Sequence, residues 1–315
     1  MCLLVAVAAC SSGQKTSMKP DENVESGTNS EVVFNADSAF AYVKAQVDFG
    51  PRVPNTDAHR RAGDWLETEL KRHGAQVVVQ PMQLTAFDGT VLNARNIMGQ
   101  YNPQTPDRLL LMAHWDTRPW ADNDPNPANH KKPLDGANDG ASGVGVLLEV
   151  ARALAANNPG RGIDILFLDA EDWGSHSDDN SWTLGAEYFV NNPIVPNYRP
   201  AQAILVDMVG GRGSLFYREG QSHYNAPGLT DAVWSTAASS GFSNIFVNQL
   251  GGAVTDDHVK FLQAGIPAID IIAYDPTSGT GFPPTWHTTR DNMQNIDPQV
   301  LGAVGQVLLN YIYAR

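Results

Sequence analysis

Cysteine is nearly absent from this chain of 315 residues: the two cysteines are Cys2 and Cys10, and none follows them. The body of the chain therefore has neither a disulfide bond nor a thiolate ligand for a metal. Any metal site must be built from histidine and carboxylate side chains, a ligand set that suits zinc.

Positive charge and long apolar runs are also scarce. Lys and Arg number 21 against 34 Asp and Glu, which gives a formal net charge of −13. This excess argues against nucleic acid or an anionic membrane surface as a partner, because both repel an acidic protein. It fits a cationic ligand, such as a metal ion or a free amino terminus. No stretch beyond the first residues is long and apolar enough to cross a bilayer.

The chain starts with a short apolar run at residues 3–9. This run is too short to span a bilayer and is typical of the end of a secretory signal. Val7-Ala8-Ala9-Cys10 resembles a bacterial lipobox, in which Cys10 would carry a lipid; a chance apolar start is the alternative. We therefore expect residues 1–10 to be the remnant of a signal peptide, and the protein to be an exported, periplasmic lipoprotein of a Gram-negative bacterium.

Composition divides the remainder into a tether and a domain. Residues 11–35 are rich in Ser, Gly, Asn, Glu and Lys, which predicts a flexible tether. Residues 36–315 have a globular pattern with no second linker and no internal repeat, so we expect a single catalytic domain there.

Within the domain, apolar periodicity alternates between helix and strand. The expected helices are 56–73, 143–156, 229–240, 257–263 and 298–313. The expected strands are 76–82, 96–101, 108–113, 163–168, 203–208 and 267–273. Short apolar strands separated by helices predict an α/β fold in which helices cover both faces of a sheet.

Polar clusters follow several of these strands. They are His114-Trp115-Asp116, Asp169-Ala170-Glu171-Asp172, Asp207, the turn Gly136–Gly140 before a helix, and Trp286–Asn292. Functional groups of such sheets gather beyond the carboxyl ends of the strands. We therefore expect the five clusters to converge on one edge of the sheet.

The adjacent carboxylates Glu171 and Asp172 are costly to ionise together unless a cation or a proton joins them. They indicate a metal site with a catalytic carboxylate. Each further candidate also has a purely structural interpretation: His114 as a hydrogen-bonded core residue, Asp139 as a turn residue or helix cap, Asp207 as an acceptor for backbone donors, Trp286-His287 as a surface turn. Together they supply the imidazole and carboxylate ligands that zinc requires.

The order of these motifs resembles the zinc-dependent aminopeptidase-like superfamily. The motifs are His114-x-Asp116, Asp139 in a turn of small residues, Glu171-Asp172, Asp207 and His287. The resemblance extends from about residue 36 to the end of the chain. It implies a zinc exopeptidase-like fold: a single-domain three-layer α/β/α arrangement with a mixed, mostly parallel central sheet.

Within that superfamily the chain is most similar to bacterial-type glutaminyl-peptide cyclotransferases. The similarity lies in Thr255–Leu262, Gly265-Ile266-Pro267 and Trp286–Asn292. It implies that one zinc ion per chain is held by three ligands and that the other residues have the following roles. The ligands would be Asp139, Asp172 and His287; Glu171 would transfer protons; Asp207 and Asp256 would be further catalytic carboxylates; His114 and Asp207 would be the remnant of a second metal site; Trp286 and Phe282 would line the substrate pocket.

Two positions depart from the pattern of the cyclotransferases. The family often has Glu-Glu where this chain has Glu171-Asp172, and the shorter Asp172 remains a carboxylate ligand. Asp270 stands where animal cyclotransferases have a histidine that pairs with the equivalent of Asp256. Two close carboxylates at this point must share a proton or point apart.

The resemblance implies conversion of N-terminal Gln in peptides and proteins to pyroglutamate with release of ammonia, zinc polarising the γ-carbonyl and Glu171 carrying the proton. The alternative is a co-catalytic dizinc aminopeptidase, in which Asp139 bridges two zinc ions and His114 and Asp207 complete the second site. A third possibility is an inactive binding domain on the same scaffold. Such relatives lose the base or a ligand, whereas this chain retains both.

Overall fold

A six-stranded sheet forms the centre of the fold in the computed structural model, which describes residues 1–4 and 32–314. The strands lie in the order β1 (Gln76–Thr85), β2 (Val91–Tyr101), β4 (Gly162–Leu168), β3 (Arg108–His114), β5 (Gln202–Asp207) and β8 (Ala268–Ile272). β4, β3, β5 and β8 run parallel to their neighbours in this group, whereas β1 pairs antiparallel with β2 and β2 with β4. The predicted mixed, mostly parallel sheet is confirmed.

The helices that the sequence predicts are all present, with ends shifted by a few residues. The helices are α1 (Ala36–Val47), α2 (Asp57–Arg72), α3 (Ala141–Ala156), α4 (Leu184–Asn191), α5 (Gly220–Asn225), α6 (Pro227–Ser239), α7 (Asp257–Gln263) and α8 (Pro298–Tyr313). A small separate sheet contains β6 (Phe216–Arg218) and β7 (Phe246–Leu250). Periodicity missed α1, α4 and α5. The last two span 8 and 6 residues, too few turns for an apolar repeat to stand out.

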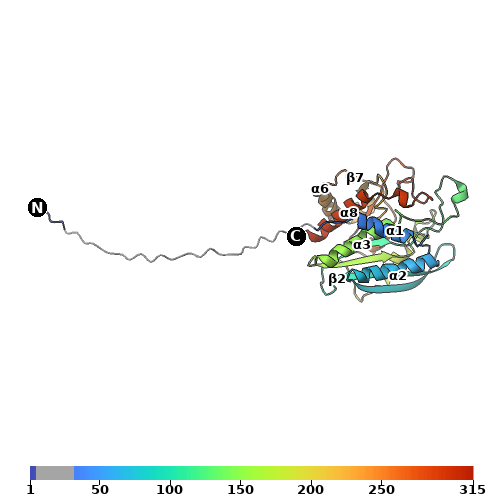
Figure 1. Ribbon diagram of the computed structural model, residues 1–315, viewed down its shortest axis with the longest axis horizontal. Helices are drawn as coiled ribbons and strands as arrows, with labels where there is room; N and C mark the ends of the chain where they lie inside the picture. The colour runs from blue at the N-terminus through green and yellow to red at the C-terminus, as the bar shows by residue number, and fades with distance from the viewer. Residues whose placement is uncertain (5–31, 315) are drawn as a thin grey trace. The chain divides into compact units, whose positions relative to one another are not determined.

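Both faces of the sheet are covered, which makes three layers. Along β3, Leu109 and Leu111 pack into the cluster formed with α1, α3 and α8. Leu110 and Met112 point to the opposite face, where they join a cluster that includes residues of α4 and α7. Because both faces of this strand are buried, its sequence is a continuous apolar run rather than an alternating one. Figure 1 shows α1, α3 and α8 side by side over the first face.

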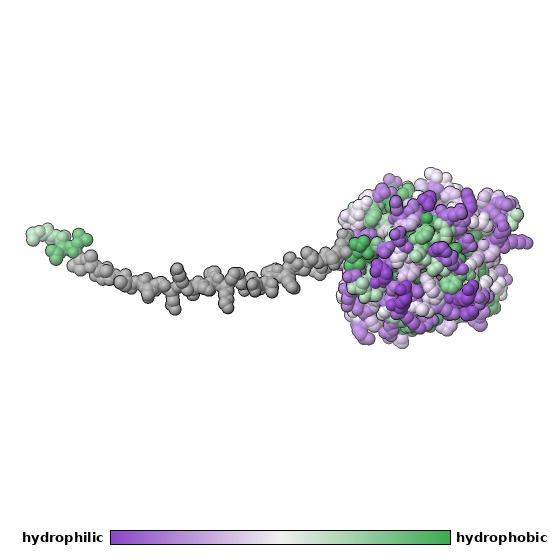
Figure 2. Space-filling model, viewed as in Figure 1, coloured by the Kyte–Doolittle hydropathy of each residue, from purple (hydrophilic) through white to green (hydrophobic). Residues whose placement is uncertain are grey.

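Among the described residues of the domain, few large apolar side chains are exposed. On the face drawn in Figure 2, hydrophobic residues are interspersed among hydrophilic ones. In the described part of the chain, no helix combines the length and the apolar character needed to cross a membrane. The proposed anchor at Cys10 and most of the predicted tether, 11–31, lie outside the described residues.

Side-chain caps fix where several helices begin. Thr56 accepts a hydrogen bond from the backbone N–H of His59 at 3.2 Å, and Asp297 caps α8 directly before a proline at its first position. Asp256 caps α7 by accepting from the backbone N–H of Asp257 at 2.6 Å. This last cap links the start of α7 to the pocket described below.

Candidate functional site

The register of the sheet brings the polar clusters to one edge. His114 ends β3 opposite Leu168 of β4, and Met112 of the same strand pairs with Leu205 of β5, two residues before Asp207. Because these strands are parallel neighbours, the residues that follow them emerge together. The structure thus brings His114, Asp207 and the segment after Leu168 into one site.

A tight turn after β4 presents Glu171 and Asp172. Ala170 adopts a left-handed conformation with φ of 54°. The carboxyl group of Asp116 accepts hydrogen bonds from the backbone N–H of Glu171 at 3.1 Å and of Asp172 at 3.2 Å. Asp116, two residues after the end of β3, therefore holds this turn, a role that its place in the motif does not reveal.

A second turn, before α3, presents Asp139. The carboxyl group of Asp291 accepts from the backbone N–H of Asn138 at 2.8 Å and of Asp139 at 3.0 Å. Gly140 has φ of 90°, and a Cβ atom there would lie 2.8 Å from the carbonyl oxygen of Asp116. The turn therefore requires glycine at this position.

Asp139, Asp172 and His287 meet in the arrangement expected of metal ligands. One ligand atom of each lies within 4.8 Å of the others. His287 Nε2 is 3.3 Å from Asp172 Oδ1 and 3.6 Å from Asp139 Oδ2. All three residues are buried, and Asp172 Oδ1 has no hydrogen-bond partner within the described part of the chain. An unpaired buried carboxylate oxygen beside a second carboxylate and an imidazole fits a zinc ion.

The ionisation of this group fits the binding of a cation. Burial and then the charge of Asp139 raise the pKa of Asp172 well above its ordinary value. Burial lowers the pKa of His287 to about 3, so its imidazole is neutral and able to bind a metal. His287 also has a left-handed backbone with φ of 54°, a strained conformation that clusters at functional sites.

His114, Asp139 and Asp207 form a second group of potential ligands that shares Asp139 with the first. Here the imidazole hydrogen-bonds to Asp207 and forms a close ion pair with Asp139: His114 Nε2 lies 3.1 Å from Asp207 Oδ1 and 3.1 Å from Asp139 Oδ1. Although burial opposes it, the carboxylates of Asp207, Asp116 and Asp139 raise the pKa of His114 well above its ordinary value. The imidazole thus lies between the two carboxyl groups of the second group and offsets part of their negative charge.

Glu171 lies beside these groups with a free carboxyl end. Among the described residues none forms a hydrogen bond with its side-chain oxygens. Burial raises the pKa of Glu171 well above its ordinary value, and Asp172 adds to the rise while His114 opposes it. A carboxyl group of this kind suits general acid–base chemistry near neutral pH.

A pocket of about 520 Å³ opens over the two groups. Aromatic rings wall the side next to His287: Trp286 stacks on its ring with centroids 3.8 Å apart, and Phe282 packs on Trp286 at 4.3 Å. Trp182 lies nearly parallel to His287 at 5.9 Å. The remaining lining comes mainly from the segments 252–256 and 278–282.

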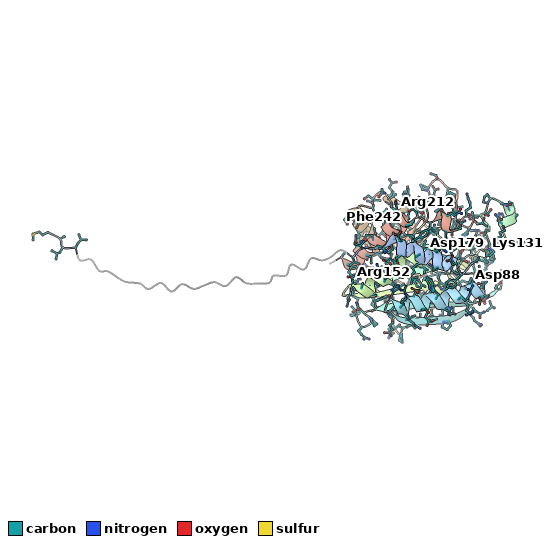
Figure 3. All side chains as sticks on the ribbon, in the orientation of Figure 1. Asp88, Lys131, Arg152, Asp179, Arg212 and Phe242 are labelled. Atoms are coloured by element: carbon teal, nitrogen blue, oxygen red, sulfur yellow. The ribbon has the colours of Figure 1, made fainter. Side chains whose placement is uncertain are left out.

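Two loops that had no predicted role contribute to the site. The segment 174–182 supplies His176, Asp179 and Trp182 to the pocket. Figure 3 labels Asp179 on this segment and Lys131 on the loop that projects from the domain. The loop that contains Lys131 also contains Asp122. Its Oδ1 lies 3.7 Å from His287 Nδ1, and its Oδ2 lies 3.2 Å from His176 Nε2.

Arg118 holds together three segments that surround the pocket. Its guanidinium donates to the carbonyl oxygens of Asp172 and Gly174 and pairs with Asp122 at 2.5 Å. Its buried charge therefore lies behind both the metal group and the 174–182 segment. Neither Arg118 nor Asp122 has a periodic signal, because loops place them.

A larger hollow of about 880 Å³ lies elsewhere, between the start of α2 and the β1–β2 hairpin. Its arginines are already paired: Arg60 with Asp57 at 2.7 Å, and Arg95 with Asp64 at 2.8 Å. It contains none of the clustered unpaired groups found at the other pocket. The chemistry therefore belongs to the smaller one.

Comparison with known proteins agrees with this geometry. The fold and the cluster of carboxylates and imidazoles define a zinc-dependent, exopeptidase-like enzyme. Residues 96–312 match the family described as Peptidase family M28, and by this match over more than half of its length the chain belongs to that family.

Solved structures of bacterial relatives are similar over almost their whole length. A glutaminyl cyclase of Porphyromonas gingivalis is 53% identical with a TM-score of 0.87, over 89% of this chain and 98% of that one. A Zn-dependent exopeptidase of Parabacteroides distasonis is 52% identical with a TM-score of 0.89, over 91% and 100%. The aminopeptidase YwaD of Bacillus subtilis is 25% identical over 98% of this chain, which spans only 62% of the length of that relative.

Proposed function

We propose that this enzyme is a glutaminyl-peptide cyclotransferase that converts the N-terminal Gln of peptides and proteins to pyroglutamate and releases ammonia. The observation that carries the proposal is the aromatic wall of Trp286 and Phe282 stacked against His287, directly beside the metal group. Ring closure needs a compact, water-poor pocket that holds one folded side chain, and stacked aromatic rings provide it.

Asp139, Asp172 and His287 would hold one zinc ion, which supplies a Lewis acid for the γ-carbonyl oxygen of the substrate. The contacts of His114 Nε2 with Asp139 and Asp207, each at 3.1 Å, support a single ion in this proposal, because the imidazole occupies the position between the two carboxyl groups.

Glu171 is the proton carrier in this proposal. In the reaction the α-nitrogen forms a bond to the side-chain carbonyl carbon, and the bond from that carbon to the amide nitrogen breaks. Ring closure removes two protons from the α-ammonium group: one is released to solvent, and Glu171 takes the other and passes it to the leaving nitrogen, which departs as ammonia. Its raised pKa suits both steps.

Asp207 and Asp256 face the same pocket and would contact the α-amino end of the substrate. Burial raises the pKa of Asp256 to about 7, and the nearby Asp207 adds to the rise. Carboxyl groups with this range of proton affinity can stabilise charge that develops on nitrogen during ring closure.

Mass spectrometry of a Gln-initiated peptide after incubation with the zinc-loaded enzyme tests the proposal. Loss of ammonia with all residues retained is the expected result. Release of free glutamine would instead identify a peptidase, and an unchanged peptide would reject both activities. A peptide that starts with Asn is the matched control, because its side chain is one methylene too short for the same ring.

A dizinc aminopeptidase is the second candidate, and one observation favours it. Two groups of potential ligands share Asp139, as a bridging carboxylate between two metals would require. Metal analysis separates the candidates: two zinc ions per chain together with hydrolysis of amino-acid arylamides would favour the peptidase.

We also propose that the protein is exported and attached to a membrane by a lipid on Cys10. The support is the lipobox-like sequence Val7-Ala8-Ala9-Cys10. Fractionation of cells that express the Cys10→Ser variant tests this: the variant should leave the membrane fraction, and its retention there would reject the anchor.

A further inference from the structure

A buried imidazole outside the proposed active site contacts the segment that presents Glu171. His59 lies in the first turn of α2 and is 4% exposed. Its Nε2 lies 2.9 Å from each carboxyl oxygen of Asp169, which is buried and two residues before Glu171. Polar groups are costly in the interior unless they are hydrogen-bonded, so the other contacts of this pair indicate its purpose.

The carboxyl group of Asp169 joins the turn after β4 to the neighbouring strand. One oxygen accepts a hydrogen bond from the backbone N–H of Ala170 at 2.8 Å, and the other accepts from the backbone N–H of Arg95 in β2 at 2.7 Å. Ala170 has a left-handed backbone, which is strained for a residue other than glycine. Asp169 therefore holds the strained residue that directly precedes Glu171, and His59 holds Asp169.

The face of the same imidazole packs beside the second support of this turn. The ring stacks on Trp115, with centroids 4.3 Å apart and an interplanar angle of 11°. Trp115 directly precedes Asp116, whose carboxyl group accepts hydrogen bonds from the backbone N–H groups of Glu171 and Asp172. His59 thus contacts one of the two carboxylates that hold the turn and the residue next to the other.

We propose that His59 is a positioning residue for the proton transfer. The hydrogen bond from its Nε2 orients the carboxyl group of Asp169, which in turn holds Ala170 in its left-handed conformation. That conformation directs the side chain of the next residue, Glu171, into the pocket. The inference rests on the proposed function, because it assumes that Glu171 carries the proton.

Two substitutions of His59 separate its hydrogen bond from its ring. His59→Gln keeps an N–H donor near the position of Nε2, whereas His59→Phe keeps a ring to stack on Trp115 and has no donor. With a Gln-initiated peptide, His59→Phe should lower kcat about tenfold to a hundredfold, a loss that misplacement of a reacting group can cause. His59→Gln should restore kcat to within about threefold of the wild type. KM should stay within about threefold and zinc should be retained in both variants, since no proposed ligand is changed.

A double-mutant cycle with Glu171→Gln tests whether His59 acts through the proton carrier. In the Glu171→Gln background, His59→Phe should lower the residual kcat by at most about twofold, because the group that it positions is already absent. Long incubations followed by mass spectrometry measure this residual turnover. A role of His59 in general stability would instead give the same fold loss in both backgrounds.

His73→Phe is the matched control. His73 follows the last residue of the same helix, α2; it is 6% exposed, and its Nε2 lies 2.8 Å from the hydroxyl oxygen of Tyr42. It precedes β1, whose first residues lie near the start of β4 and so at the end of the sheet opposite the pocket. This variant also loses a buried hydrogen bond but should keep kcat, which separates positioning from the general effects of a buried histidine.

An unchanged kcat in His59→Phe, an equally large loss in His59→Gln, or equal losses in the two backgrounds would overturn the role of His59. If His59→Phe does not fold, His59→Asn replaces it, because the shorter amide takes the position of Nδ1 and does not reach Asp169. A wild-type enzyme that makes no pyroglutamate would overturn the proposed function and this role with it. A wild-type enzyme that cyclises, combined with any of the first three results, would overturn the role of His59 alone.

Discussion

His114 and His287 are both buried beside Asp139, but their surroundings give them opposite ionisation. Three carboxylates, those of Asp207, Asp116 and Asp139, overcome burial at His114 and raise its pKa well above the ordinary value. At His287 burial prevails over Asp139 and, helped by the nearby charge of Arg118, lowers the pKa to about 3. One imidazole is therefore a cation and the other a neutral base.

In the proposed function, this difference separates His287 as a metal ligand from His114 as a cation that takes the place of a second metal. The neutral ring of His287 has a lone pair for zinc and lies beside an unpaired oxygen of Asp172. The ring of His114 lies 3.1 Å from a carboxylate oxygen of Asp139 and 3.1 Å from one of Asp207, and its raised pKa favours the protonated form, which has no lone pair for a metal. A scaffold with two sets of potential ligands can in this way hold one metal ion.

Of the substitutions at these residues, the change of His287, the proposed zinc ligand, should have the largest effect. His287→Ala should lose zinc and activity together, because the remaining Asp139 and Asp172 cannot complete the site. Loss of a Lewis acid removes several kcal/mol of transition-state stabilisation, so kcat/KM should fall by at least about a thousandfold. Zinc analysis after dialysis, with His73→Ala as the buried-histidine control, checks the result; a variant that kept stoichiometric zinc would contradict the assignment.

Glu171→Gln tests the proposed proton carrier, a role that neither His114 nor His287 has in the proposed reaction. The variant should keep its zinc, because glutamine occupies the same space as glutamate and Glu171 is not among the proposed ligands. Its kcat should fall by about 10²- to 10⁴-fold, the usual contribution of a general acid–base. Pyroglutamate formation and metal content should be measured on the same sample, with Glu149→Gln on α3 as a buried control. Retained turnover would reject Glu171 as the proton carrier.

His114→Gln should have a smaller effect. If His114 only balances the charges of Asp139 and Asp207, the variant keeps one zinc ion per chain and loses about tenfold in kcat/KM through the altered setting of Asp139. Metal analysis of both proteins is decisive. Two zinc ions in the wild type and one in the variant would make His114 a ligand and would favour the dizinc alternative.

The sequence predicted the site residues that directly follow regular strands. The continuous apolar runs of β3 and β4 identified the strands, and the polar residues after them identified the sheet edge. The family resemblance then suggested different roles for His114 and His287. It could not give the direction of their pKa shifts, which depend on burial, on Asp207 and Asp116 beside His114, and on Arg118, which a loop places near His287.

Loops and long-range hydrogen bonds supplied what the sequence could not. Asp291 holds the turn at Asp139 from 152 residues away. His176 and Trp182 reach the pocket from a segment without periodicity. The sequence left open whether Asp256 and Asp270 share a proton or point apart, because the packing of α7 against β8 decides it. In the described part of the chain neither oxygen of Asp270 has a hydrogen-bond partner.

The smallest expected effect is a pair of opposite pH dependences in the metal-free protein. The pKa of His114 in the folded state is raised above 6.5, so the folded state binds this proton more tightly than the unfolded state does. Its contribution to the free energy of unfolding is complete below pH 6.5 and is lost as the pH rises through the folded-state pKa. The pKa of His287 is lowered to about 3, so the unfolded state takes up this proton first and stability falls from pH 6.5 towards pH 3. Urea unfolding followed by tryptophan fluorescence, for the wild type against His114→Gln and His287→Gln, should therefore give difference curves that change in separate windows, one above pH 6.5 and one below it. Curves that change in the same window would mean that the two imidazoles ionise alike, and the distinction between ligand and cation would fail.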